Sequence, residues 1–215
     1  LFESIEELFL KGENPLYLSS LIREDSVETF IQYVNANNIS LNTRIISSIF
    51  EYNSFLIERE KVSLIEYAAF YGSIEILQFL SMNHVELTSS LWMYAIHGKN
   101  PNIIHLLEEN HVKPIDETFI QYMLESIKCH HNDFANYFKD NYVNIEYLDL
   151  YLLSSYSYYN FTFFPEGIEF IKDEEKSCFS LSKIILPSSI NMILDGTFMD
   201  CPNLKQVIFP AELQY

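Results

Sequence analysis

The segment Ser63-Leu-Ile-Glu-Tyr-Ala-Ala-Phe-Tyr-Gly72-Ser-Ile-Glu-Ile-Leu-Gln-Phe-Leu-Ser-Met-Asn83 contains two short apolar stretches on either side of one glycine. In the second stretch, over residues 76–80, apolar residues recur three apart, which places one broad apolar stripe on one side of a helix. The first stretch, over residues 64–69, ends in two alanines that allow a neighbouring helix to approach closely. The segment therefore predicts a helix, a tight turn and a second helix.

The same unit occurs four times. The second stretches lie at residues 30–34, 76–80, 103–107 and 134–138, and the first stretches at 16–22, 64–69, 91–96 and 119–123. Each unit ends in an asparagine and, two residues later, an apolar β-branched residue: Asn37 and Ile39, Asn83 and Val85, Asn110 and Val112, Asn141 and Val143. We expect each asparagine to end its helix in the left-handed conformation, with the apolar residue folding back as a cap.

The units are unevenly spaced. The longest step leaves residues 41–62 as an insertion, in which Ile45-Ile46 and Ile49-Phe50 form an amphipathic stretch of their own. Repeats of about 20–50 residues are typical of solenoids, which bind other macromolecules along extended surfaces. Trp92 has apolar neighbours at helical spacing and is expected in the core.

The segment over residues 63–83 resembles an ankyrin repeat, whose pattern reads roughly T-P-L-H-x-A-A-x-x-G-H-x-E-I-V-x-L-L-L-x-x-G-A. Matching positions carry Gly72, Glu75, Ile76, Phe79 and Leu80, while Ser63-Leu64-Ile65-Glu66 replaces T-P-L-H and Asn83 replaces the second glycine. Residues 15–155 as a whole are similar to a divergent ankyrin-like domain of unassigned function that is expanded in some protists. The resemblance implies partner contacts from the first helices and the loops before them. A generic stack of helical hairpins is the alternative.

The last third repeats a short strand. Phe163-Phe164-Pro165, Ile185-Leu186-Pro187 and Ile208-Phe209-Pro210 recur at nearly equal steps, and each proline ends the hydrogen-bond ladder. The run Asp195-Gly196-Thr197-Phe198-x-x-Cys201-x-x-Leu204-x-x-Val207-x-Phe209-Pro210 resembles a BspA-like leucine-rich repeat, over about residues 160–215. The predicted fold class is therefore α+β: an all-α ankyrin-like solenoid over residues 1–155, and an incomplete, β-rich leucine-rich-repeat solenoid over residues 156–215.

The charge balance excludes several partner classes. With 30 acidic and 13 basic residues the net charge is −17, which argues against nucleic acid or an anionic membrane as a partner because phosphates require clustered Lys and Arg. No apolar run reaches the roughly 18 residues that a membrane span needs. The acidic surface favours a monomer. The odd cysteine count, three, favours a reducing compartment, so a cytoplasmic location is expected.

No residue pattern indicates catalysis. The five glycines are scattered singly, so no phosphate-binding loop is predicted. His84 and His111 are equivalent to Asn38 and Tyr142 in the other units, which indicates turn positions rather than metal ligands. His130-His131-x-Asp133 lacks a second group of ligands. Cys178 and Cys201 are expected to stack as buried thiols, with a disulfide or a metal as alternatives. We predict no enzyme, no catalytic residue, no cofactor and no metal.

The predicted function is protein–protein recognition by a scaffold. By analogy with leucine-rich repeats, the partner-binding positions are the solvent-facing strand residues Lys183, Ile185, Gln206 and Ile208. Tyr158 and Tyr159 are added because tyrosine is favoured in interfaces, although their aromatic run, residues 151–164, equally fits a core between the two solenoids. The alternatives are a cell-surface adhesin and a substrate-docking arm of a larger enzyme.

Overall fold

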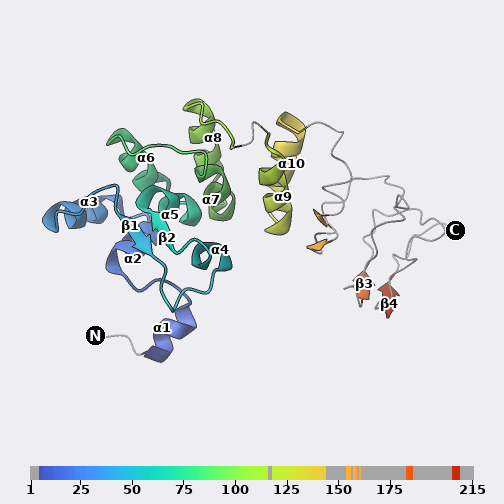
Figure 1. Cartoon of the computed structure of the whole chain (residues 1–215), viewed down its shortest axis with the longest axis horizontal. Helices are drawn as coiled ribbons and strands as arrows, with labels where there is room; N and C mark the ends of the chain where they lie inside the picture. The colour runs from blue at the N-terminus through green and yellow to red at the C-terminus, as the bar shows by residue number, and fades with distance from the viewer. Residues whose placement is uncertain are drawn as a thin grey trace. The chain divides into compact units, whose positions relative to one another are not determined.

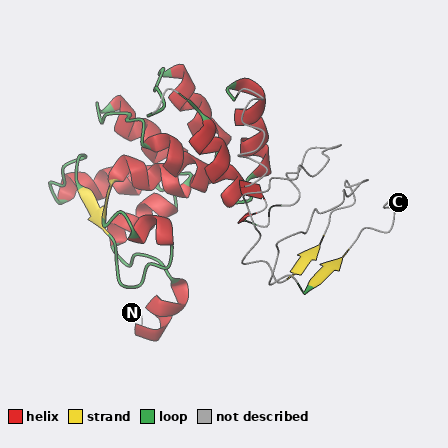
Figure 2. Cartoon of the chain, turned by 45° about the vertical axis from the view of Figure 1, so that its right-hand side comes forward, coloured by secondary structure: helices red, strands yellow, loops and turns green. Residues whose placement is uncertain are grey.

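The computed structural model describes residues 5–115 and 118–143, and beyond them residues 154, 155, 157, 158, 160, 183–185 and 205–208. The chain divides into two compact units, Leu1–Val143 and Asn144–Tyr215, and each is described by itself. The predicted domain boundary at residue 155 stays a prediction. The described residues are mostly helical (Figure 2), with ten helices. None of these helices is long and apolar enough to cross a membrane.

The first unit is an array of four helix pairs that follows α1 (Ile5–Lys11). The pairs are α2 (Tyr17–Arg23) with α3 (Val27–Ala36), α5 (Leu64–Tyr71) with α6 (Ile74–Met82), α7 (Leu91–Gly98) with α8 (Pro101–Glu109), and α9 (Ile120–Lys128) with α10 (Asn132–Asn141). The first helices α2, α5, α7 and α9 pack on one another in this order, and each packs on its own second helix (Figure 1). All eight predicted helices are therefore confirmed.

The first helices form the core of this unit. In α5, six of eight residues are buried, including both alanines of the predicted close contact, Ala68 and Ala69. Trp92 is only 1% exposed, as predicted, and its Nε1–H donates to the carbonyl of Val112 at 3.0 Å. The second helices bury a single stripe, such as Ile103, Ile104 and Leu107 in α8, and turn polar residues outward.

The asparagines at the ends of the second helices act differently from the prediction. Asn37, Asn83 and Asn110 have φ values of −101°, −93° and −86°, so none is left-handed. Instead, the side-chain Nδ2–H of Asn37, Asn83, Asn110 and Asn141 donates to the carbonyl four residues earlier, at 2.8 Å in every case. This hydrogen bond holds the asparagine near helical geometry. The residue that adopts the left-handed conformation is therefore the next one.

The next residues take that position: Asn38, His84 and His111 have φ values of 51°, 64° and 55°. Each is followed by the apolar residue of the cap, whose N–H donates back to the helix: Ile39 to Val34, Val85 to Leu80, and Val112 to Leu107. These are Schellman closures, so the predicted cap is confirmed at three helix ends. At the fourth, α10, Val143 N–H donates to Phe138 in the same way, at 3.1 Å, but Tyr142 has a φ of −133° and is not left-handed.

The insertion over residues 41–62 contains the amphipathic stretch that the sequence indicates at residues 45–50. It forms β1 (Arg44–Ile46), antiparallel to β2 (Lys61–Ser63), with α4 (Ser54–Ile57) between them. Ile45 is buried whereas Ile46 is 60% exposed. Neighbouring side chains on opposite faces are the pattern of a strand.

The second unit contains two described strands. β3 (Lys183–Ile185) and β4 (Gln206–Ile208) pair in parallel, with Lys183 opposite Gln206 and Ile185 opposite Ile208. This register is the one that aligns Pro187 with Pro210 in the sequence, so the two predicted neighbouring strands are confirmed. The third predicted strand, at residues 163–164, and both Cys178 and Cys201 lie outside the described residues.

A recurring hydrogen bond joins successive helix pairs. The residue before each second helix reaches a carbonyl at the end of the preceding pair's first helix: Ser73 Oγ–H donates to Ile22, Asn100 Nδ2–H to Gly72 at 2.8 Å, and His131 Nδ1 lies 2.7 Å from the carbonyl of Ile96. Carbonyls in the last turn of a helix lack partners within it. One side chain per pair therefore satisfies such a carbonyl and fixes the next pair against it.

We expect Asn100→Ala to lower the free energy of unfolding by about 1–3 kcal/mol, because it removes the bond to Gly72 and the N-cap bond that Asn100 Oδ1 accepts from Asn102 N–H. Urea denaturation measures the change. Asn100→Asp keeps the N-cap acceptor and removes the donor, so it isolates the bond between pairs. Asn102→Ala, at an exposed neighbouring position, is the control. Equal stability of the Asp variant and wild type would show that the bond between pairs contributes nothing.

The helices α5 and α7 approach so closely that Gly98 has no room for a side chain. A Cβ there would meet the carbonyl of Ala69 and lie 2.8 Å from the backbone nitrogen of Gly72. Both neighbours are backbone atoms, which cannot rotate away. Gly72 itself has a φ of 75° and ends α5 in the left-handed conformation.

Gly98→Ala should therefore destabilise the protein by about 1–3 kcal/mol, the usual result of overpacking. The sign of this change in stability is diagnostic, because alanine in a helix is otherwise about 1 kcal/mol more favourable than glycine. Thermal denaturation followed by circular dichroism provides the comparison. Gln78→Ala on the exposed face of α6 serves as the control. A variant as stable as wild type would mean that α5 and α7 are not in contact at this glycine.

Glu108 connects α8 to the end of α10. Its Oε1 accepts hydrogen bonds from the hydroxyls of Tyr137 and Tyr142, at 2.5 and 2.6 Å, and its Oε2 lies 3.1 Å from Nδ1 of His105. Burial on its own would raise the pKa of Glu108, but these three partners outweigh it and hold the pKa below the ordinary value of 4.5. The carboxylate form is thus favoured by folding.

Because the pKa is depressed, the stability that Glu108 contributes is fully present above pH 4.5 and is lost as the pH falls through its folded value. We expect the double variant Tyr137→Phe with Tyr142→Phe to be less stable than wild type by about 1–3 kcal/mol at pH 7. The difference should shrink at pH values below the folded pKa. Urea titrations at several pH values test this, with the exposed Tyr52→Phe as control. A difference that does not change with pH would refute the role of the carboxylate.

Candidate functional site

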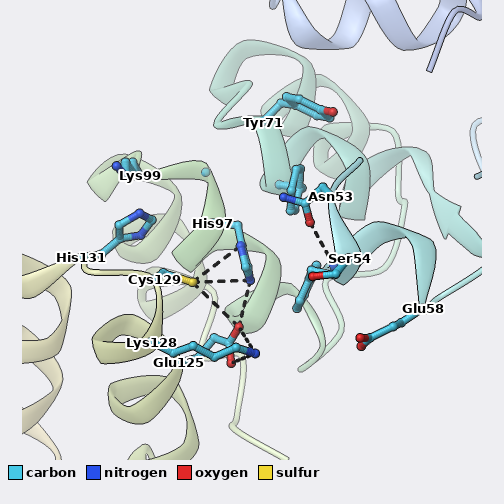
Figure 3. A pocket seen from close by; sticks show the side chains of 13 residues that line it. Asn53, Ser54, Glu58, Tyr71, His97, Lys99, Glu125, Lys128, Cys129 and His131 are labelled. Atoms are coloured by element: carbon cyan, nitrogen blue, oxygen red, sulfur yellow. Dashed lines mark hydrogen bonds and ion pairs between the residues drawn. The ribbon is translucent and has the colours of Figure 1, made fainter. Parts of the chain in front are cut away.

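A pocket of about 590 Å³ lies where the C-terminal ends of α5, α7 and α9 meet the start of α4 (Figure 3). Its lining residues come from four elements far apart in the chain: Asn53, Ser54, Phe55, Glu58, Phe70, Tyr71, His97, Gly98, Lys99, Glu125, Lys128, Cys129 and His131. The first helices end at a common edge because successive pairs are joined there, so the array itself creates the pocket.

The wall opposite α9 is supplied by α4. The Phe55 ring contacts the rings of Phe70, Tyr94 and His97, with centroids 5.8, 5.1 and 4.0 Å away. The Arg59 guanidinium covers the other side, 3.4 Å from the Phe55 centroid. The insertion therefore packs on α5 and α7, first helices from which the ankyrin resemblance implies partner contacts.

His97 stands in the last turn of α7, at the centre of the lining. Its ring lies near those of Phe55 and Phe70, at centroid distances of 4.0 and 5.3 Å. Its Nε2 is 3.1 Å from Oε1 of Glu125 on α9, and the two side chains are only 14% and 11% exposed. A histidine–carboxylate pair largely shielded from water thus joins two consecutive helix pairs.

Cys129 completes a cluster of three with this pair. It follows Glu125 by four residues, one helical turn, so both side chains lie on the same side of α9. Its Sγ is 3.7 Å from Nδ1 and 3.9 Å from Nε2 of His97, and 3.9 Å from Oε1 of Glu125. One nitrogen, one oxygen and one sulfur therefore converge, all within 4.8 Å of one another.

The charges around the cluster set its protonation. Burial raises the pKa of Glu125, but the hydrogen bond with His97 and the charge of Lys128, whose Nζ is 3.5 Å from both carboxylate oxygens, lower it below its ordinary value overall. Burial, followed by the charge of Glu125, raises the pKa of Cys129 to about 11. At neutral pH, then, the carboxyl is ionised and the thiol is protonated.

This protonation argues against a thiol nucleophile. Reactive cysteines have depressed pKa values and often stand at helix N-termini or beside cations. Cys129 instead caps the C-terminal end of α9, where the partial negative charge of the helix disfavours a thiolate. The neighbouring carboxylate acts in the same direction. The arrangement supports binding of a ligand or an ion better than covalent catalysis.

The partner-binding residues predicted from the sequence belong to the second unit, and nothing in the structure tests their role. Gln206 and Ile208 in β4 are exposed, Ile208 by 36%, and Tyr158 is 42% exposed. Lys183 and Ile185 form β3, opposite these β4 residues. Tyr159 lies outside the described residues. These positions stay predictions.

The histidines singled out in the sequence are in turns. His84 and His111 have left-handed backbones and are exposed, as expected for turn positions. His130 is left-handed as well, with a φ of 58°. His131 lines the pocket, but its Nδ1 faces the carbonyl of Ile96, and burial, the largest influence, lowers its pKa. Within the described residues, the three ligand types that converge are those of His97, Glu125 and Cys129 instead.

The cluster of His97, Glu125 and Cys129 is not predicted by the sequence. Only the spacing of Glu125 and Cys129, one turn apart on a predicted helix, is a local signal, and such pairs are common. His97 is brought to them by the packing of α7 on α9, which no spacing rule reveals.

Comparison with known families adds one finding. The family model described as Domain of unknown function (DUF3447) matches residues 82–166. This range contains α7 to α10 and therefore all three residues of the cluster. Neither an ankyrin nor a leucine-rich-repeat family model matches. No curated protein matches the chain, and no solved structure does. Residues 82–166 thus match the DUF3447 model, and the described part of this range up to residue 143 is largely helical.

Proposed function

We propose that the chain is a non-enzymatic protein-binding module, in which a divergent ankyrin-like array precedes BspA-like leucine-rich repeats. Two observations support the repeat assignments. The helix pairs share the asparagine bond and, at three ends, the same Schellman closure. The strands β3 and β4 pair in the register that stacked coils require. Solenoids of both kinds present extended surfaces to partners.

The observation that carries the proposal is a group of exposed apolar side chains, here called the N-terminal patch. It consists of Ile5, Leu10, Ile46, Ile49 and Tyr52, which are 68%, 84%, 60%, 81% and 62% exposed. Contacts between α1 and the segment after β1 bring the two segments together: the rings of Phe9 and Phe50 are 4.8 Å apart, and Tyr52 N–H donates to the Gly12 carbonyl at 3.1 Å.

These five residues lie on two segments that contact each other, whereas the exposed apolar side chains of ordinary surfaces are scattered singly. At the equivalent outward positions of the second helices stand Gln32, Gln78, His105 and Asn136, which are polar and exposed. Large exposed apolar patches on soluble proteins mark interaction sites. The N-terminal patch is therefore the surface of the first unit best suited to a protein partner.

Charge indicates the chemistry of that partner. Glu6 and Glu7 are exposed in the first turn of α1, beside the patch, and the chain carries a net charge of −17. An apolar segment flanked by Lys or Arg would fit both features, with the basic residues steering association. We therefore assign the patch to a basic, apolar segment of another protein.

Site-specific photo-crosslinking in source cells tests this assignment. A photoreactive amino acid at Leu10 or Ile49 should capture a protein that then binds the purified chain. Ile49→Glu should weaken that binding by at least about 10-fold, since interface centres exclude charge. Added salt should weaken it further. The same probe at Gln78 is the control, and a probe at Gln206 tests the predicted strand surface.

Three results would contradict the assignment. A crosslink only to a second copy of the chain would show self-association. Binding that is insensitive to Ile49→Glu and sensitive to a substitution at Gln206 would move the interface to β4. Capture of an acidic partner whose binding strengthens with salt would refute the charge argument.

A further inference from the structure

The cluster of His97, Glu125 and Cys129 has the donor set and the spacing of a metal site. Zinc in proteins is bound by His nitrogen, Cys sulfur and Asp or Glu oxygen, usually with tetrahedral geometry. Bond lengths of about 2.0–2.3 Å in that geometry place the ligand atoms roughly 3.3–3.6 Å from one another. The observed separations are 3.1 Å from Nε2 to Oε1, and 3.9 Å from Sγ to each of these atoms.

Each separation is thus within about 0.4 Å of the tetrahedral value. The two longer distances both involve Sγ, and a small rotation of the Cys129 side chain changes them together. Glu125 and Cys129 share one side of α9, and His97 faces them from α7. Three ligands from two helix pairs are in place.

We propose that His97, Glu125 and Cys129 bind a divalent transition-metal ion, with Zn²⁺ the best match. The mixed nitrogen, sulfur and oxygen set suits Zn²⁺ better than Mg²⁺ or Ca²⁺, which prefer oxygen ligands alone. All three residues line the pocket of about 590 Å³ (Figure 3), so a fourth coordination position is open to water or a small ligand. The ion ties α7 to α9, and with them two consecutive helix pairs.

The neighbouring cation limits the affinity without blocking the site. Lys128 Nζ lies 3.5 Å from both oxygens of Glu125, where it partly satisfies the carboxylate. Its side chain is 48% exposed, compared with 11% for Glu125, so the ammonium can move into solvent when a metal binds. Lys128→Ala should therefore leave the ligands intact and bind the metal more tightly.

The first experiment uses the full chain with Cys178→Ser and Cys201→Ser, which leaves Cys129 as its single thiol. Titration with Co²⁺, a spectroscopic substitute for Zn²⁺, should produce a thiolate-to-cobalt charge-transfer band and the visible absorption of a tetrahedral site. Both should saturate at one equivalent and disappear when Zn²⁺ is added. Zn²⁺ at about 100 times its Kd should raise the melting temperature by about 5–10 °C.

Three variants identify the ligands. Cys129→Ser, His97→Gln and Glu125→Gln should each weaken Co²⁺ binding by more than about 10-fold. His84→Gln and His111→Gln, which change exposed turn histidines, should have no effect and are the matched controls. Circular dichroism confirms that each variant is folded. Because the spectrum of the unsubstituted site reports thiolate ligation directly, the test does not depend on any variant folding.

The proposal is overturned if Co²⁺ produces no charge-transfer band, or if the band persists in Cys129→Ser. Unchanged affinity in Glu125→Gln or His97→Gln would refute the three-ligand assignment. Weaker binding in Lys128→Ala would show that Lys128 supports the site and that the carboxylate is not a free ligand. None of these outcomes depends on the protein partner, so this inference and the proposed function fail independently.

Discussion

The helical unit depends on one hydrogen bond that recurs between helix pairs. A side chain before each second helix, Ser73, Asn100 or His131, bonds to a carbonyl at the end of the preceding first helix. Such carbonyls otherwise have no partner within their helix. Three chemically different side chains perform this task, so the requirement is a hydrogen-bonding group at that position rather than one residue type. The bond fixes where each pair sits against the one before it, and consequently brings the first-helix ends to one edge.

The pocket follows from this constraint, but only α4 closes it. Without the insertion, the rings of Phe70, Tyr94 and His97 would face solvent at the edge of α5 and α7. Phe55 covers them, and Arg59 covers Phe55 in turn. The insertion is anchored at its own ends by the pairing of β1 with β2. Part of the first-helix layer is therefore used for internal packing, while α1, β1 and the segment after β1 carry the five exposed apolar side chains of the N-terminal patch.

The sequence predicted what depends on local periodicity. Eight helices and the register of β3 with β4 follow from the spacing of apolar residues and prolines, because each side-chain face is determined by its own segment. The helix ends were predicted only in part, since the choice between a left-handed Asn83 and a left-handed His84 depends on where the Asn83 amide bonds. The amphipathic stretch at residues 45–50 does not by itself indicate a strand, and only the pairing of β1 with β2 reveals one. The cluster of His97 with α9 could not be predicted, because it exists only once α7 packs on α9.

The proposed metal site and the N-terminal patch differ in their position relative to residues 82–166, the range that the DUF3447 model matches. Residues 82–166 contain the three proposed metal ligands, whereas the N-terminal patch lies outside that range. The pocket straddles the boundary: α7, α9 and His131 belong to the matched range, while Phe55 and Phe70 do not. The three proposed ligands of the metal site therefore all lie inside the matched range. The small ligand that could reach the open coordination position of the proposed metal ion would depend on the insertion and α5, which close the pocket in this chain.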